Sequence, residues 1–242
     1  MTALAHNLEV LEEAITAACR HAGRARSQVE LMAVSKTYPA ATVAEAAVLG
    51  LTLFGESRVQ EFAAKSRELP SLLPPALPLP RFHLIGHLQS NKAQRAVELF
   101  DAIDTVDSLR LAERLNEAAG KFGKRLPVLL EVKLSPEASK AGLDPTSAEA
   151  AQLLERLPDL PQLDLQGLMT IAPFDVPEDE TRACFRALLQ WRDRWAHQHS
   201  RLRFEVLSMG MSGDFALAIA EGATRIRVGS SLFGVRSAAG QN

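Results

Sequence analysis

The sequence has few of the features that mark specialised classes of protein. Only two cysteines occur in 242 residues, Cys19 and Cys184, and they lie far apart without a CxxC spacing. Both fall in helical patterns, so two small buried side chains are expected rather than a disulfide. No stretch approaches the ~20 apolar residues of a transmembrane helix, and the first residues lack the apolar core of a signal peptide. A soluble, cytoplasmic protein is therefore expected.

An excess of charge of one sign is also missing. The chain has 27 Lys and Arg against 29 Asp and Glu, a formal net charge of −2. This balance argues against a protein that binds nucleic acid by neutralising many phosphates, although it allows one small basic pocket. The apolar share of 47% is close to the average of soluble globular proteins, and a chain of this length can bury a full core without metal ions. We expect no nucleic-acid partner and no membrane partner.

Strand-like and helical segments alternate along the chain. An amphipathic helix is expected over 3–22. The short apolar runs that predict strands lie near 29–34, 52–54, 82–85, 101–106, 127–133, 164–169, 203–207 and 224–228. Helical patterns follow them at 42–50, 57–68, 91–99, 108–119, 147–157, 179–197, 214–221 and in a short segment after 230.

This alternation predicts a parallel sheet with right-handed crossovers. Eight strand–helix units in 242 residues amount to ~30 residues each, which is typical of a closed barrel. An open doubly wound sheet is the alternative, but no glycine-rich dinucleotide fingerprint follows the first strand. The sequence predicts one α/β domain over 1–242, a (β/α)8 TIM-type barrel. An extra N-terminal helix within 1–27 packs on it, and 237–242 form a tail.

Local signals add three expectations about the connections. Thr42 with Glu45, and Thr146 with Glu149, have the spacing of capping boxes at helix starts. Residues 69–80 hold five of the thirteen prolines and are expected to form a surface loop at the bottom of the barrel. A proline motif that binds a partner is the alternative for this segment.

A lysine follows the first predicted strand directly, in Ser35-Lys36-Thr37. The site of a barrel lies at the carboxyl ends of its strands, so Lys36 is expected at the mouth, partly desolvated. Desolvation lowers the pKa of an amine, and the neutral amine is the form that attacks an aldehyde to give a Schiff base. The alternative is a lysine that reaches from a strand end into water.

Two loops rich in Gly and Ser follow the seventh and eighth predicted strands, Ser208–Ser212 and Gly229–Ser231. These are the positions of the recurrent phosphate site of this fold, and their N–H and hydroxyl groups suit an anion. Each loop alone is more typical of a turn. Opposite Lys36, the two loops together suggest pyridoxal 5′-phosphate (PLP) as the ligand.

Two arginines share one face of the last predicted strand, Arg225 and Arg227. In a barrel this face is the interior, where a guanidinium needs a partner. An exposed pair near the strand end is the alternative. His83 and His87 are four residues apart but lie where a strand passes into a loop, so no helical zinc face forms and no metal is expected.

Six segments together resemble one known family: Val34–Thr37, Phe54–Glu61, His83–Lys92, Gly167–Met169, Leu207–Ser212 and Arg227–Arg236. From about residue 28 to 236 the sequence resembles the pyridoxal phosphate homeostasis protein family, whose barrel is similar to the N-terminal barrel of alanine racemase. The resemblance implies a protein that buffers PLP and delivers it to PLP-dependent apo-enzymes, without established turnover. A monomer is expected.

The resemblance also implies roles for particular residues. Lys36 would hold PLP as a Schiff base, Ser208, Gly229 and Ser230 would bind its phosphate, and Arg227 would face the pyridine nitrogen. Lys140 matches a family lysine that offers a second amine at the mouth, with a surface lysine as the alternative.

Two departures from the family pattern lie near this site. Ser57 stands where the family commonly has Asn, which puts one hydrogen bond near the pocket in doubt, and Tyr38 stands where Lys is frequent, just past Lys36.

Two classes of enzyme are alternatives to the interpretation of this sequence as a PLP carrier. A PLP-dependent racemase needs an acid/base group on each face of the substrate carbon, and the only tyrosine is Tyr38. The chain ends soon after the eighth strand, so the second domain of alanine racemase is not expected. An arginine at the pyridine nitrogen also weakens the ring as an electron sink. An aldolase would place its lysine later in the barrel. Binding without efficient turnover is therefore predicted.

Overall fold

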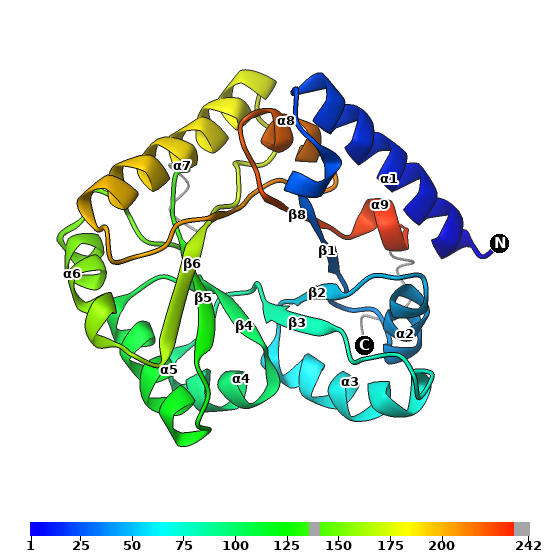
Figure 1. Ribbon diagram of the computed structural model, residues 1–242, viewed down its shortest axis with the longest axis horizontal. Coiled ribbons are helices and arrows are strands. Elements are labelled where there is room, and N and C mark those ends of the chain that lie inside the picture. The colour runs from blue at the N-terminus through cyan, green and yellow to red at the C-terminus, as the bar shows by residue number, and fades with distance from the viewer. Residues whose placement is uncertain (136–140, 235–242) are drawn as a thin grey trace.

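A computed structural model describes residues 1–135 and 141–234 of the protein. Eight parallel strands close into a barrel in chain order, with β1 paired to β8, and the helices surround it (Figure 1). The predicted (β/α)8 barrel is thus confirmed, and the open doubly wound sheet is excluded. The tail predicted at 237–242 lies outside the described residues.

The strands are short and mostly buried. They are β1 (Glu30–Val34), β2 (Leu53–Glu56), β3 (Arg81–Leu84), β4 (Ala102–Val106), β5 (Leu126–Glu131), β6 (Leu163–Met169), β7 (Val206–Ser208) and β8 (Arg225–Val228). The α-helices are α1 (Ala3–His21), α2 (Ala40–Val48), α3 (Val59–Leu72), α4 (Ala93–Leu99), α5 (Leu109–Lys121), α6 (Ala148–Arg156), α7 (Glu178–Gln198), α8 (Phe215–Ala220) and α9 (Ser230–Phe233). Short 3-10 turns lie at Arg26–Gln28, Ser90–Lys92 and Leu157–Asp159.

The N-terminal helix packs on the outside of the barrel, as predicted. In α1 the residues Leu4, Leu11 and Ile15 recur at helical spacing and are buried, and α1 lies along α8 and α9 (Figure 1). Asn7 Nδ2 donates a hydrogen bond to the carbonyl oxygen of Leu232 in α9 at 3.0 Å. This helix therefore covers the seam at which β8 meets β1.

Both predicted capping boxes are wrong. Helix α2 begins two residues before Thr42, after Pro39, because Ala40 is already packed in the core at 3% exposure. Helix α6 is capped by Ser147, whose hydroxyl accepts the N–H of Ala150 at 3.1 Å. Thr146 instead binds the preceding Asp144, so the cap lies one residue later than the sequence spacing suggested.

The proline-rich segment is a loop only in its second part. Helix α3 continues through Pro70 to Leu72, so the prediction of a loop from residue 69 is wrong at its start. Burial of Leu69 and Leu73 accounts for the added helical turn, since both side chains pack in the core. The rest of the segment connects α3 to the start of β3, at the barrel end opposite the strand C-termini.

Candidate functional site

Lys36 lies immediately after β1, half-buried at the carboxyl ends of the strands, as predicted. It lines a pocket of about 290 Å³ that is formed by the loops after β1, β2, β3, β5 and β6. The polar and apolar groups around this pocket include Lys36, Ser57, Gly86, His87, Glu131 and Ile171. This volume is near the lower end for small-molecule sites. Lys36 is therefore placed to meet a small ligand.

The backbone on the N-terminal side of Lys36 is held by a buried ion pair. Lys65 Nζ of α3 lies 2.5 Å from Glu56 Oε1 at the end of β2 and donates to the carbonyl oxygen of Ser35 at 2.8 Å. The Ser35 hydroxyl donates to the same Glu56 oxygen at 2.7 Å. Burial raises the pKa of Glu56 above its usual value, although Lys65 opposes this shift. We call Ser35, Glu56 and Lys65 the β1 brace.

The backbone on the other side of Lys36 is held as well. Thr37 has a φ of 70°, a conformation that costs energy for a β-branched residue, and its N–H donates to the Glu61 carboxylate of α3. Glu61 Oε1 is also 3.8 Å from Lys65 Nζ. The peptide groups that flank Lys36 are thus anchored to α3 from both sides.

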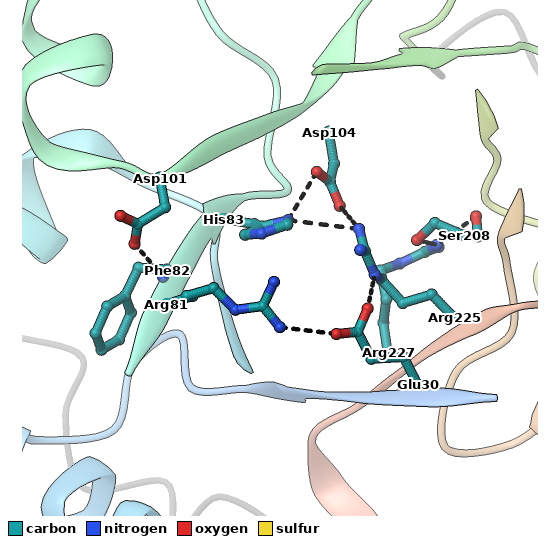
Figure 2. Close-up of polar contacts among 9 residues, drawn as sticks. All are labelled: Glu30, Arg81, Phe82, His83, Asp101, Asp104, Ser208, Arg225 and Arg227. Atoms are coloured by element: carbon teal, nitrogen blue, oxygen red, sulfur yellow. Dashed lines mark hydrogen bonds and ion pairs between the residues drawn. The ribbon is translucent and has the colours of Figure 1, made fainter. Parts of the chain in front are cut away.

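The arginines of β8 point into the barrel, and the alternative of an exposed pair is wrong. Arg225 donates from Nε to Glu30 Oε2 at 2.8 Å and from Nη1 to Asp104 Oδ2 at 3.2 Å (Figure 2). His83 Nδ1 lies 3.0 Å from Asp104 Oδ1. Burial raises the pKa of Asp104, but His83 and Arg225 outweigh it, and the net pKa is lowered. The positive charge of Arg225 inside the barrel is therefore compensated by the carboxylates of Glu30 and Asp104.

Arg227 is fixed above this cluster by hydrogen bonds to two other strands. Its Nη1 donates to the carbonyl oxygen of Ser208 at 2.7 Å and to the Ser208 hydroxyl at 3.0 Å (Figure 2). Its Nη2 donates to the carbonyl oxygen of Thr170 at 2.9 Å. The Ser208 side chain is completely buried. The Ser208 hydroxyl thus accepts a hydrogen bond from Arg227 inside the barrel, and the phosphate-binding role that the family resemblance implies for Ser208 stays a prediction.

The loop after β8 presents converging N–H groups. Gly229 N and Ser231 N point to the hydroxyl oxygen of Ser212, at 3.3 and 3.4 Å. These distances are long for N–H···O hydrogen bonds, so both donors are only weakly satisfied by Ser212. A Cβ on Gly229 would lie 3.3 Å from the carbonyl oxygen of Val34, which shows how closely this loop approaches β1.

The predicted site residues thus form two adjacent groups. Pairing of β1 with β8 sets Ala33 beside Val228, so Lys36 and the loop that begins at Gly229 leave neighbouring strands. Ser230, the first residue of α9, is exposed. Among the described residues, none from the loops after β7 and β8 lines the 290 Å³ pocket itself. Lys140 lies outside the described residues.

The two departures from the family pattern take different places. Ser57 lines the pocket together with Lys36. Tyr38 turns away to the C-terminal end of α9, where its hydroxyl donates to the carbonyl oxygen of Gly234 at 2.8 Å and its ring lies 4.8 Å from that of Phe233. Tyr38 therefore ties the loop after β1 to α9.

The roles of three groups were missed by reasoning from the sequence. Glu131 is the last residue of β5, only 6% exposed, and lines the pocket. Its position at a strand end was a usable signal, but the surrounding apolar run favoured a core strand. Lys65 also escaped notice, because the carbonyl oxygen that it binds lies 30 residues away in the chain. Ser212 was placed in the loop expected at the phosphate, but its role as acceptor for Gly229, 17 residues away, was not foreseen.

Other classes of site are not found in the described parts of the chain. Across 1–135 and 141–234, no cluster of three or more His, Cys, Asp or Glu side chains could hold a metal ion. His87 Nδ1 instead lies 3.3 Å from Asp107 Oδ2, and both cysteines are buried. No helix in these ranges combines the length and the apolar character needed to cross a membrane.

Comparison with known proteins agrees with this geometry. The family model of the alanine racemase N-terminal domain matches residues 1–237. The chain is 39% identical over 237 residues to the pyridoxal phosphate homeostasis protein of Escherichia coli K12, covering 98% of both chains. It is 41% identical over 236 residues to that of Pseudomonas aeruginosa PAO1, covering 98% of this chain and 97% of the relative.

Solved structures of related proteins also match this chain. PipY of Synechococcus elongatus PCC7942, solved with PLP bound, is 44% identical with a TM-score of 0.81, over 96% of this chain and 100% of PipY. An alanine racemase of Clostridium difficile 630 is 17% identical with a TM-score of 0.69, over 98% of this chain and 57% of the racemase, and shows the shared fold alone. The chain belongs to the alanine racemase N-terminal domain family and, within it, to the pyridoxal phosphate homeostasis proteins.

Proposed function

We propose that the protein binds PLP, holds it through Lys36 and takes part in cellular PLP homeostasis by buffering the cofactor and delivering it to PLP-dependent apo-enzymes. The observation that carries this proposal is Lys36 itself, half-buried beside a pocket of about 290 Å³ at the barrel mouth. PLP supplies an aldehyde, which a neutral lysine amine attacks to form a Schiff base. The β1 brace holds the backbone of this lysine in place before any ligand arrives.

The chain also has donors that fit the phosphate of PLP. The N–H groups of Gly229 and Ser231 converge on one point, and the Ser230 hydroxyl is exposed beside them. An anion at this point would replace two long contacts by charge-assisted hydrogen bonds, which are shorter and stronger. We therefore assign phosphate binding to Gly229 and Ser230, with Ser208 acting through Arg227, whose guanidinium we assign to the pyridine nitrogen.

An amino-acid racemase is the alternative function, and Tyr38 argues against it. Racemisation needs a second acid/base group opposite the lysine, and Tyr38 is the only tyrosine. Its hydroxyl donates a hydrogen bond to the carbonyl oxygen of Gly234 at 2.8 Å and is therefore directed toward the C-terminal end of α9. Because the hydroxyl of this tyrosine is engaged at Gly234, we propose binding without efficient turnover.

The test is incubation of the PLP-loaded protein with L-alanine and other amino acids in deuterated buffer. Proton exchange at the α-carbon and D-isomer formation are followed at high protein concentration. A turnover number in the enzyme range of ~1–10³ per second would overturn the proposal in favour of a racemase. Absence of inversion, with or without slow α-proton exchange, is the expected result. The monomeric state and the cytoplasmic location stay predictions.

A further inference from the structure

Glu131 is an unusual residue for the end of a barrel strand. Its side chain is 94% buried, and its Oε2 has no hydrogen-bond partner in the structure. A buried polar atom without a partner destabilises the folded protein, and more so when it is charged. Glu131 also lines the pocket that contains Lys36. A buried carboxyl oxygen without a hydrogen-bond partner at the wall of a binding pocket points to a ligand group that completes it.

The surroundings of Glu131 decide which ligand group fits. Besides burial, Asp107 after β4 raises the pKa of Glu131, whereas Arg227 of β8 and His87 after β3 lower it. Lys36 and Lys133 line the same pocket. Burial and Asp107 prevail and raise the pKa of Glu131 to about 7. The carboxyl is therefore able to give up and take back a proton near neutral pH.

A carrier must release its cofactor, and release from Lys36 requires that the covalent bond to the lysine nitrogen be broken. PLP bound through Lys36 leaves most readily when a second amine takes the place of the lysine nitrogen. Amines with a pKa near ~10 are almost entirely ammonium ions at neutral pH, and an ammonium nitrogen has no lone pair with which to attack. A proton acceptor inside the pocket removes this obstacle, and a carboxylate attracts the ammonium ion as well.

We propose that Glu131 accepts the proton of the incoming amine that displaces the cofactor from Lys36, so that the pocket is an amine-accepting site. This inference rests on the proposed function. The ammonium ion R–NH3⁺ gives a proton to the Glu131 carboxylate and becomes R–NH2. Its lone pair forms a bond to the carbon that carried the aldehyde oxygen. As the double bond from that carbon to the Lys36 nitrogen breaks and a double bond to the incoming nitrogen forms, the two remaining N–H protons of the amine pass to the Lys36 nitrogen. The proton held by Glu131 then completes the Lys36 ammonium ion. Atoms and charge balance, and no oxidant or reductant is needed.

The test compares two small displacing agents on the PLP-loaded protein. Methylamine is an ammonium ion at neutral pH and needs a proton acceptor, whereas hydroxylamine is already neutral and does not. The rate at which the cofactor loses its covalent bond to Lys36 is measured as a function of pH for wild type and Glu131→Gln, by quenching samples with borohydride and quantifying the remaining Lys36 adduct by mass spectrometry. Glu155→Gln, which changes an exposed carboxyl on α6, is the matched control.

For wild type we expect the methylamine rate to level off above about pH 7, where Glu131 is ionised. For Glu131→Gln the rate should be about 10²-fold lower near neutral pH and rise tenfold per pH unit toward the pKa of the amine. Hydroxylamine should displace PLP from both proteins at similar rates. Infrared titration of the cofactor-free protein should show a carboxyl ionising at about pH 7 that Glu131→Gln lacks.

Asp107→Asn gives a second test that does not alter Glu131 itself. Because Asp107 raises the pKa of Glu131, removing its charge should move the break in the methylamine profile to lower pH. Identical methylamine profiles for wild type and Glu131→Gln would overturn the inference and leave the proposed function standing. Absence of any Schiff base on Lys36 would overturn the proposed function, and the inference with it.

Discussion

Replacing Lys65 with methionine tests the β1 brace that holds the backbone beside Lys36. Methionine fills a similar volume but removes the ammonium group that lies 2.5 Å from Glu56 and 2.8 Å from the carbonyl oxygen of Ser35. Glu56 is fully buried, and its Oε2 has no hydrogen-bond partner in the structure. Lys65→Met therefore leaves a carboxyl inside the protein with the Ser35 hydroxyl as its remaining donor.

The expected cost follows from this arrangement. Removing one partner of a buried ion pair costs about 3–5 kcal/mol of unfolding free energy. For a chain of this size the melting temperature should fall by about 6–20 °C. In the same variant the carbonyl oxygen of Ser35 loses Lys65 as a donor and keeps the N–H of Tyr38 at 3.1 Å, so the backbone that positions Lys36 is held less firmly. We expect PLP affinity to fall about tenfold, equivalent to ~1.4 kcal/mol.

The destabilisation should depend on pH with a defined sign. Burial already raises the pKa of Glu56, and Lys65 is the main group that opposes this rise, so Lys65→Met raises the pKa further. A carboxyl whose folded pKa lies above its unfolded value of ~4.3 binds more protons in the folded state, so stability falls as the pH rises between these two values. The cost of Lys65→Met should thus be smaller near pH ~5 than near pH ~8.

Urea unfolding at both pH values measures this cost. The double variant Glu56→Gln with Lys65→Met is the control, because it removes the buried charge and should recover a large part of the lost stability. A cost below about 1 kcal/mol, or one that is equal at both pH values, would refute the reasoning that the pair is buried and coupled. An unchanged PLP affinity would refute the positioning role of the brace.

Three further predictions concern other parts of the barrel. Asp104→Asn should lower the free energy of unfolding by about 3–5 kcal/mol at neutral pH, as measured by urea unfolding. This difference should shrink as the pH falls below ~4, because a carboxyl with a lowered pKa stabilises the fold only while it is ionised. Tyr38→Phe should cost about 1 kcal/mol through loss of the hydrogen bond to Gly234 and leave PLP binding unchanged, and a loss of binding would contradict its role as a tie. Gly86→Ala would set a Cβ 2.2 Å from the carbonyl oxygen of Ser57. PLP binding should therefore weaken about tenfold or more while the circular dichroism spectrum stays native. Binding as tight as in wild type would contradict the close approach of the two pocket loops.

The fold was predictable from the sequence because its signals are local and repeated. Apolar runs of strand length alternate with helical patterns eight times, and each unit has the length that a barrel needs. Errors arose where tertiary packing decided the boundary. Ala40 extends α2 past the expected cap, and Leu69 and Leu73 keep α3 helical through Pro70, because burial outweighs the local preference.

The site was predictable only in part. Lys36 could be placed because it directly follows an apolar strand, and Arg225 and Arg227 could be assigned to the interior by strand alternation. The brace residue Lys65 could not be found in this way, because its role depends on a carbonyl oxygen 30 residues away. The unpaired Oε2 of Glu131 could not be predicted from the sequence either, because the burial of one carboxylate oxygen depends on the folded pocket.

The central claim is that Lys36 is the residue that holds PLP. The most direct measurement is borohydride reduction of the PLP-loaded protein, followed by proteolysis and mass spectrometry of the modified peptides. We expect the reduced adduct to lie on Lys36 and Lys36→Ala to abolish the Schiff-base absorbance. An adduct found chiefly on Lys140, or on any other lysine, would contradict it.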